Sequence, residues 1–164
     1  MGKGIQVKKM FDAIADRYDL MNRVMTFGQD QGWRRFVVSK TGQIEKGWLL
    51  DLATGTGDIA NLLSQAHSGS RVIGADFSLG MFKEAKKRFS GKKICWQGCD
   101  ANVLPFRENV FNGVTFGYLL RNVDDSVAVL KEVYRVLKPG GKVVCLDTTP
   151  PAKNFFYPFV RLYF

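Results

Sequence analysis

Hydrophobic residues follow a helical spacing in the first part of the chain. Apolar side chains there recur at steps of three and four, which places them on one face of an α-helix; they are Val7, Phe11, Ile14 and Tyr18. The repeat is interrupted at Gly28, and residues 31–40 resume a short amphipathic segment. We therefore expect residues 1–46 to form a helical segment.

From residue 47 the pattern changes to short apolar runs that alternate with amphipathic stretches. The apolar runs predict strands over residues 48–52, 71–76, 93–98, 113–120 and 142–147. The amphipathic stretches predict helices over residues 59–66, 79–89 and 127–137. Ser78 is placed as the N-cap of the second of these helices. Pro139-Gly140-Gly141 should end the third, because proline lacks a backbone donor and glycine accepts a positive φ.

Strands that alternate with crossover helices favour a parallel sheet with helices on both faces. The fold class is therefore predicted as α/β, a three-layer doubly wound domain over residues 47–150. The remaining segment, residues 151–164, is rich in aromatic side chains. Exposed apolar area of this kind usually marks an interface, so we expect this tail to pack on its own core or to bind another molecule.

Composition narrows the class of protein. A chain of 164 residues with 46% hydrophobic residues is long enough for one well-buried core. No stretch approaches the roughly 20 apolar residues of a spanning helix, and the first residues do not resemble a signal peptide. Three cysteines are too few for a disulfide framework, so we expect a reduced, cytoplasmic protein.

The chain is basic, with a formal net charge of +9. Such a charge indicates either a solvated basic surface or attraction to nucleic acid or an anionic membrane. No run of aromatic and basic residues resembles a nucleic-acid module, so no nucleic-acid partner is expected. Peripheral contact with a membrane stays open.

The clearest chemical signal is the segment DLATGTGD, residues 51–58, which follows a predicted strand and opens a predicted helix. Glycines at this place allow a tight turn and a close approach of a ligand to the backbone. Asp76 ends the next strand, about 20 residues further on, where a carboxylate can accept hydrogen bonds from both hydroxyls of a ribose. The combination predicts a cofactor that contains a nucleoside.

An NAD-dependent oxidoreductase is one alternative, because the loop also matches the dinucleotide pattern G-x-G-x-x-G/A. Three features argue against it. A long helical segment precedes the loop; Asp100-Ala101 follows the third strand, where it can hydrogen-bond an adenine amino group; and Asp58 stands at a helix N-terminus, where a carboxylate would repel a pyrophosphate. A cofactor with a cationic sulfonium and an amino acid in place of phosphates tolerates these acids.

Several of these segments resemble class I S-adenosylmethionine-dependent methyltransferases: DLATGTGD, Asp76, DANVLPFRENVFN (100–112) and RVLKPGGKVV (135–144). Two more, FDAIADRYDLMNRVMTFGQDQGWRR (11–35) and LLRNV (119–123), resemble signatures of the UbiE/COQ5 (MenG) family, which C-methylates the quinol ring in ubiquinone and menaquinone biosynthesis. The resemblance covers essentially the whole chain. It implies a Rossmann-like, mainly parallel sheet of five strands in the order 3-2-1-4-5, a helical N-terminal lid, and S-adenosyl-L-methionine as methyl donor, with S-adenosyl-L-homocysteine as product.

The resemblance also implies which residues bind the donor: Asp51, Ala53, Thr54, Gly55, Thr56, Asp76, Phe77, Met81, Asp100, Ala101 and Gly117. The chain departs from the usual pattern at three positions. Gly117 stands where relatives usually have serine, which removes a hydroxyl from that contact. Asn112 stands where aspartate is common, and Ala53 where many methyltransferases have glycine.

A weakly nucleophilic quinol carbon needs its hydroxyl deprotonated or polarised, so a base or a cationic partner is expected. Arg121, just past the fourth strand, Asp147, closing the fifth, and Tyr18, from the helical segment, are the candidate catalytic residues. His67, the single histidine, precedes the second strand at the rim opposite to where such sheets bind ligands. No metal is expected, because Cys95, Cys99 and Cys145 have no nearby histidine with which to bind zinc.

The expected substrate is a polyprenylated benzoquinol or naphthoquinol, with Tyr18 and Trp33 helping the lid to form an apolar entrance. Members of the family continue past the position of Phe164 with further strands, so the resemblance implies that these C-terminal strands are absent here. An uncovered edge of the fifth strand invites pairing, and we expect a homo-oligomer through that edge or the aromatic tail. A donor-binding module without turnover and another small-molecule methyltransferase stay open as alternative functions.

Overall fold

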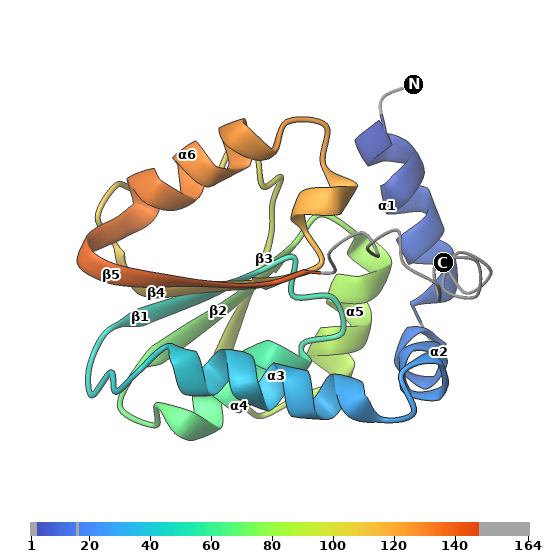
Figure 1. The fold of residues 1–164 in the computed structure, drawn as a ribbon, viewed down its shortest axis with the longest axis horizontal. Coiled ribbons are helices and arrows are strands. Elements are labelled where there is room, and N and C mark those ends of the chain that lie inside the picture. Colours follow the sequence, from blue (N-terminus) through green and yellow to red (C-terminus); the bar gives the residue numbers. More distant parts are fainter. Residues whose placement is uncertain (1–2, 16, 148–164) are drawn as a thin grey trace, which may run out of the picture.

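The computed structural model describes residues 3–15 and 17–147 of the chain (Figure 1). Three helices come first, α1 (Lys3–Ile14), α2 (Tyr18–Met25) and α3 (Gln29–Lys40). Strands and helices then alternate: β1 (Trp48–Leu52), α4 (Asp58–Ala66), β2 (Arg71–Asp76), α5 (Leu79–Arg88), β3 (Ile94–Gly98), β4 (Phe111–Gly117), the short 3-10 helix η1 (Leu120–Asn122), α6 (Ser126–Val136) and β5 (Leu137–Leu146). The predicted aromatic tail, residues 151–164, lies outside the described residues.

The five strands form one parallel sheet in the order β3-β2-β1-β4-β5. β1 is central, and its Leu50 pairs with Ile73 of β2 and with Val114 of β4. Helix α6 covers one face of the sheet, and α3, α4 and α5 cover the other (Figure 1). The predicted doubly wound α/β architecture and its strand order are confirmed.

A core lies on each face of the sheet because successive side chains of a strand point in opposite directions. Leu49 of β1 packs in the core beneath α3 and α4, together with Leu63. Leu50 and Leu52 pack in the other core with Val133 of α6. The run WLLDL, apolar except for Asp51, therefore suits the central strand, which is buried on both faces.

Several predicted ends needed correction. β4 begins at Phe111 and ends at Gly117, earlier than predicted, because Tyr118 takes a left-handed conformation with a φ of 57° that no strand can continue. Helix α6 ends at Val136, and β5 begins directly after it, where Leu137 pairs with Phe111. Pro139-Gly140-Gly141 thus lies inside β5, at the register shift between Phe111 and Gly113, and not in a separate turn.

The N-terminal helices pack on the α4 and α5 side of the domain. α3 contacts α4, and α1 contacts α5. Gly28 has a φ of 78°, which lets the chain reverse between α2 and α3. The division into residues 1–46, 47–150 and 151–164 stays a proposal. Among the described helices, none combines the length and the apolar character that crossing a membrane requires.

Candidate functional site

Two adjoining hollows lie at the carboxyl ends of the parallel strands. The larger has a volume of about 300 Å³ and the smaller about 50 Å³. Tyr18, Ala53, Gly55, Gly117 and Tyr118 line both of them, so the hollows share a wall. Open parallel sheets bind ligands in this position.

The loop after β1 forms part of the wall that the two hollows share. Its backbone turns sharply, with positive φ values at Ala53 (53°), Gly55 (56°) and Gly57 (88°). Two backbone hydrogen bonds hold the turn, from Thr54 N to the Ala75 carbonyl at 3.0 Å and from Gly57 N to the Thr54 carbonyl at 2.9 Å. A side chain at Gly57 would meet the Trp96 ring at 2.7 Å, so glycine is required there by packing as well as by conformation.

Asp76 stands at the end of β2 with both carboxylate oxygens fixed. Gly55 N donates to Oδ2 at 2.7 Å, and Ser78 N donates to Oδ1 at 2.8 Å. Burial raises the pKa of Asp76, and the nearby Asp12 carboxylate adds to the increase. The carboxylate is thus held at the wall of the larger hollow, where it can accept further hydrogen bonds from a vicinal diol.

Asp51 is fully buried beneath the smaller hollow. Its carboxylate accepts hydrogen bonds from Thr54 Oγ1 at 2.6 Å and from Thr115 Oγ1 at 2.7 Å. Burial raises the pKa of Asp51 to about 6, although these hydroxyl groups oppose the increase. Its protonation state therefore changes close to physiological pH.

We predict that Asp51→Asn changes how stability depends on pH. Because the pKa of about 6 in the folded protein exceeds the ordinary 3.8, the folded protein keeps a proton that the unfolded chain has released between these pH values. The free energy of unfolding therefore falls, by at most about 3 kcal/mol from this group, as pH rises through that window. Asparagine does not titrate, so the variant should gain stability relative to the wild type over the same window.

Urea unfolding at about pH 4 and about pH 7.5 measures this difference. If the difference between Asp51→Asn and the wild type is the same at both pH values, the buried carboxylate does not titrate as described.

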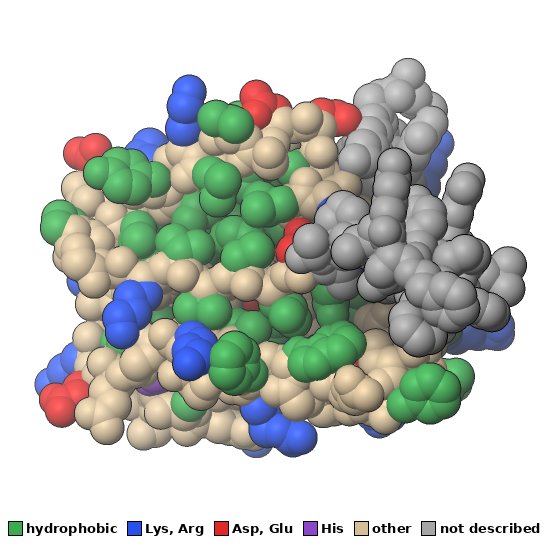
Figure 2. Space-filling model, viewed as in Figure 1, with side chains coloured by type: hydrophobic (Ala, Val, Ile, Leu, Met, Phe, Trp, Pro, Cys, Tyr) green, Lys and Arg blue, Asp and Glu red, His purple; other side chains and the backbone are tan. Residues whose placement is uncertain are grey.

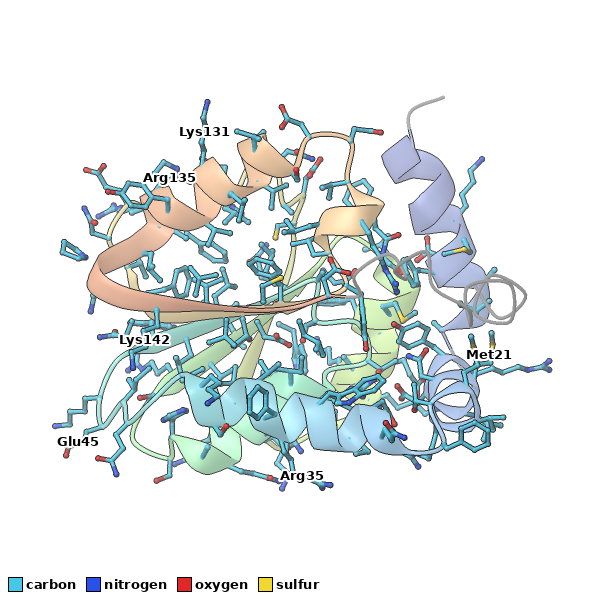
Figure 3. All side chains as sticks on the ribbon, viewed as in Figure 1. Met21, Arg35, Glu45, Lys131, Arg135 and Lys142 are labelled. Carbon is cyan, nitrogen blue, oxygen red and sulfur yellow. The ribbon has the colours of Figure 1, made fainter. Side chains whose placement is uncertain are left out.

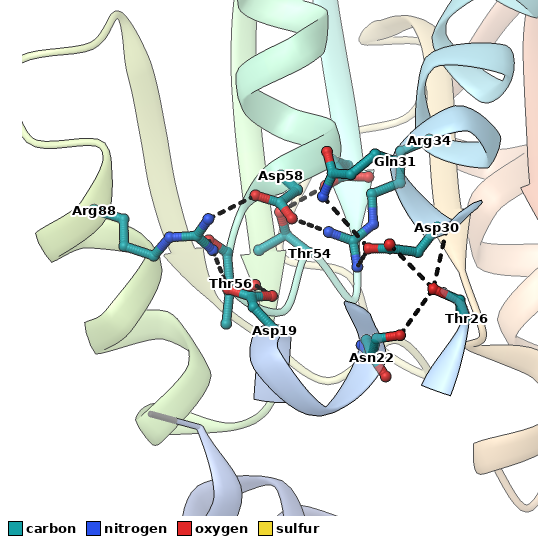
Figure 4. Close-up of polar contacts among 11 residues, drawn as sticks. Asp19, Asn22, Thr26, Asp30, Gln31, Arg34, Thr54, Thr56, Asp58 and Arg88 are labelled. Atoms are coloured by element: carbon teal, nitrogen blue, oxygen red, sulfur yellow. Dashed lines mark hydrogen bonds and ion pairs between the residues drawn. The ribbon is translucent and has the colours of Figure 1, made fainter. Parts of the chain in front are cut away.

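A network of ion pairs joins the loop to the N-terminal helices (Figure 4). Arg34 of α3, which is 7% exposed, pairs with Asp58 at the start of α4 and, at 3.4 Å, with Asp30. Arg88 of α5 pairs with Asp58 at 2.9 Å and with Asp19 of α2. Asp58 is thus held between two guanidinium groups.

Two carboxylates of α1 and α2 fasten these helices over the larger hollow. Asp19 Oδ1 accepts a hydrogen bond from Thr56 Oγ1 at 2.7 Å. Asp12 Oδ1 accepts from Ser78 Oγ at 2.6 Å and from Gly80 N at 2.7 Å. A Cβ at Gly80 would lie 2.9 Å from the Asp12 Cα, so this glycine allows α1 to approach α5 closely.

The structure brings the predicted donor-binding residues together. Phe77, Met81, Asp76, Asp100 and Ala101 line the larger hollow, together with Phe11 of α1. The smaller hollow is lined by the other loop residues of the predicted set: Asp51, Thr54 and Thr56. Ala53, Gly55 and Gly117 line both hollows. The positions of these residues support the predicted donor site, which stays a proposal.

The candidate catalytic residues separate into two groups. Tyr18 lines both hollows and packs edge-on against Phe11, with ring centres 5.7 Å apart. Arg121 and Asp147 line neither; their Nε and Oδ1 atoms are 3.9 Å apart, and the Arg121 guanidinium lies 4.6 Å from the centre of the Tyr118 ring. Trp33, expected at the entrance, also lines neither hollow.

The single histidine and the cysteines show no sign of catalytic or metal-binding roles in the described part of the chain. His67 is the C-cap of α4, and its Nε2 lies 3.0 Å from Thr41 Oγ1; burial lowers the pKa of His67. Burial raises the pKa of the Cys99 thiol to about 12, so this side chain in the larger hollow is a neutral thiol. Within residues 3–15 and 17–147, no group of three or more histidine, cysteine or acidic side chains is placed to hold a metal ion.

Sequence reasoning missed Asp12, Asp19, Arg34 and Arg88. For Arg34 a signal was present, because Asp30 and Arg34 fall on the same helical face as the buried Val37 and Val38. A charged pair on an apolar face indicates a buried partner elsewhere in the chain. Asp12 and Asp19 carry no such signal, since their partners are far away in the sequence.

Comparisons with known proteins agree over almost the whole chain. The model of the ubiE/COQ5 methyltransferase family matches residues 2–164. A protein of Desulfotalea psychrophila described as ubiquinone/menaquinone biosynthesis C-methyltransferase UbiE is 67% identical over 164 residues, which are 100% of this chain and 67% of that protein. The demethylmenaquinone methyltransferase of Thermus thermophilus is 42% identical over 157 residues, 94% of this chain and 71% of that protein.

A solved structure shows the same fold. A Methanococcus maripaludis protein described as an S-adenosyl-L-methionine-dependent methyltransferase superposes with a TM-score of 0.72 at 20% identity, over 83% of this chain and 63% of that one. The chain therefore spans about two thirds of the length of the proteins that it matches.

Proposed function

Since the chain belongs to the ubiE/COQ5 methyltransferase family, we propose that it binds S-adenosyl-L-methionine in the two adjoining hollows and methylates a ring carbon of a polyprenylated quinol. Relatives named for ubiquinone or menaquinone biosynthesis support this substrate class. The ring is a benzoquinol or a naphthoquinol. Membership of the family supports methyl transfer as the reaction. The residues that line the hollows support S-adenosyl-L-methionine as the methyl donor.

The larger hollow fits the adenosine part of the donor. Asp76 lines this hollow, and its two carboxylate oxygens, held by hydrogen bonds from Gly55 N and Ser78 N, can accept from the ribose hydroxyls. Asp100 and Ala101, just past β3, lie where an adenine amino group can be bound. A Cβ at Gly55 would meet no atom within 4 Å, so the loop leaves open space beside its backbone.

The smaller hollow fits an amino acid better than a pyrophosphate. Dinucleotide cofactors place their phosphates at a helix N-terminus. Here Asp58 begins α4, and its carboxylate is already engaged by Arg34 and Arg88. The carboxylates of Asp51 and Asp58 and the guanidinium of Arg34 line this hollow. Such a mixture of charges suits the α-ammonium and α-carboxylate groups of an amino acid. This arrangement of charges is the observation that carries the proposal.

The donor supplies an electrophilic methyl group on a cationic sulfur, so the protein mainly has to position the two reactants and exclude water. Tyr18 lines both hollows and can orient the quinol beside the donor. Tyr118 also lines both hollows, and the Arg121 guanidinium lies 4.6 Å from the centre of its ring. This guanidinium is paired with Asp147 and lies next to the hollows, from where it can favour the deprotonated quinol hydroxyl, which makes the ring carbon a better nucleophile.

Two measurements test the proposal in sequence. Calorimetric titration with S-adenosyl-L-homocysteine and with NAD should show binding of the first only. Methylation of demethylmenaquinol and of a demethoxy-type benzoquinol should then identify the ring. Tyr18→Ala should raise KM for the quinol more than KM for the donor, whereas Tyr134→Ala, an exposed aromatic outside both hollows, should change neither.

The outcomes separate the alternatives. Donor binding without methylation of either quinol would make the chain a donor-binding module. Binding of NAD in place of the homocysteine product would overturn the proposal as a whole. Equal effects of Tyr18→Ala on both KM values would remove Tyr18 from the quinol site.

A further inference from the structure

Helix α2 presents its apolar side chains to solvent. None of its residues is buried, and Leu20 and Val24 are each 66% exposed. Its polar side faces the protein, where Asp19 binds Thr56 and Arg88. A helix on the surface of a soluble domain ordinarily has the opposite orientation, with the apolar side inward. The inversion indicates that the outer side of α2 contacts something other than water.

The exposed apolar surface continues from α2 onto α3. Figure 2 shows hydrophobic side chains along α3 in the lower part of the view. Phe27, between the two helices, is 90% exposed. We call this region the α2–α3 surface; its exposed apolar members are Leu20, Met21, Val24, Met25, Phe27, Trp33 and Phe36.

Every exposed charged side chain from residue 17 to residue 40 is cationic: Arg17, Arg23, Arg35 and Lys40. The two acids in this range, Asp19 and Asp30, are not exposed and pair with arginines of the network in Figure 4. The α2–α3 surface therefore combines apolar side chains with uncompensated positive charge. Amphipathic helices with this composition lie in the surface of anionic bilayers.

Helix α6 exposes apolar side chains as well, but it lacks the purely cationic surroundings of the α2–α3 surface. α6 also exposes apolar side chains, including Tyr134, which is 82% exposed. Exposed acids, Asp124 and Asp125, stand at its start. Figure 3 shows Lys131 of α6 and Arg35 of α3 projecting from opposite sides of the molecule. An anionic surface would be attracted to α2–α3 and not equally to α6.

We propose that the α2–α3 surface docks on an anionic phospholipid bilayer, with α2 lying in the lipid headgroup region. Tyr18 begins α2 and lines both hollows, so docking brings the entrance of the site to the membrane surface. The advantage of this position rests on the proposed function, because a polyprenylated quinol is dissolved in the bilayer. The docking itself rests on the exposed apolar and basic side chains alone.

Co-sedimentation of the full chain with vesicles tests the proposal. Vesicles of phosphatidylcholine alone are compared with vesicles of phosphatidylcholine and phosphatidylglycerol in equal parts. The wild type should bind the anionic vesicles at least about tenfold more strongly, and added salt should weaken this binding. The double variant Arg23→Glu/Phe27→Glu should lower binding by at least about tenfold, because it removes a cation and an aromatic side chain that is 90% exposed and adds two acids.

The matched control is Lys131→Glu/Tyr134→Glu on α6, which makes the same change of charge and removes a similarly exposed aromatic ring. It should bind vesicles within about twofold of the wild type. Titration with S-adenosyl-L-homocysteine checks that both variants are folded, since none of the four residues lines the hollows. That titration and a methylation assay also separate failure of the proposed function from failure of docking.

Three results would overturn docking: no preference of the wild type for anionic vesicles, equal loss of binding in the two double variants, or unchanged binding in Arg23→Glu/Phe27→Glu. If light scattering shows that this variant changes the oligomeric state and not the vesicle binding, the surface is an interface between copies of the chain instead.

Discussion

Replacing Asp76 with alanine is expected to weaken binding of the methyl donor by at least about a hundredfold. The carboxylate can accept hydrogen bonds from both ribose hydroxyls, and a hydrogen bond to a charged group contributes about 1.5–3 kcal/mol. The same oxygens accept from Gly55 N and Ser78 N, so the substitution also releases the loop and the start of α5. Calorimetric titration with S-adenosyl-L-homocysteine measures the change.

Asp125→Ala is the matched control for this prediction. Asp125 also accepts a backbone hydrogen bond at the start of a helix, from Ala128 N at 2.9 Å, and it does not line the hollows. Its loss should cost about 1 kcal/mol of stability and leave donor binding unchanged. Tight donor binding by Asp76→Ala would show that the ribose lies elsewhere.

The second prediction concerns two glycines of one loop that should respond differently to alanine. At Gly57 the new Cβ would meet Trp96 at 2.7 Å, Phe89 at 3.1 Å and Ala85 at 3.2 Å, and the φ of 88° disfavours any side chain. Overpacking and this conformation together should lower the free energy of unfolding by about 2–5 kcal/mol. Urea unfolding measures the loss.

At Gly55 the added Cβ meets nothing within 4 Å, so only the strain of a φ of 56° remains. The loss of stability should be about 1–2 kcal/mol. Because Gly55 lines both hollows, the methyl group should instead reduce donor affinity by about tenfold or more. Equal losses of stability at the two positions would contradict the packing described around Gly57.

The sequence predicted the centre of the fold well because burial leaves a simple pattern there. β1 over residues 48–52 and β2 over residues 71–76 have the predicted bounds, since each is a short apolar run closed by turn residues. The N-cap role of Ser78 is confirmed, with its Oγ accepting from Met81 N at 3.2 Å. The bounds of these strands and the N-cap depend on only a few neighbouring residues, so they can be predicted from the local sequence.

The ends of β4 and β5 could not be predicted, because they depend on contacts between distant segments. Tyr118 takes a positive φ, and its N donates to the Leu146 carbonyl at 2.7 Å, which ends β4 while β5 continues beside it. Nothing in the apolar run GVTFGYLL indicates this conformation. The same applies to Asp12, whose contacts with Ser78 and Gly80 cross more than sixty residues of sequence.

Site residues at the ends of the strands could be predicted from the sequence. Those contributed by the N-terminal helices α1 to α3, apart from Tyr18, could not. The loop residues, Asp76 at the end of β2 and Asp100 after β3 line the hollows, as their places in the sequence indicated. Arg121 and Asp147 remain predictions for catalysis, placed next to Tyr118 rather than in the hollows. The oligomer expected through the β5 edge or the tail also stays a prediction.

The packing of Gly57 against Trp96 and Phe89 has a consequence for how ligands reach the site. A loop interlocked with a core cannot move alone, because displacing it would expose two aromatic rings. Helix α2, by contrast, buries no residue and is held by the polar contacts of Asp19 and by the packing of Tyr18 against Phe11. The two walls of the site therefore differ in stiffness, and we expect entry and exit of ligands to proceed by displacement on the α2 side while the loop serves as the fixed template.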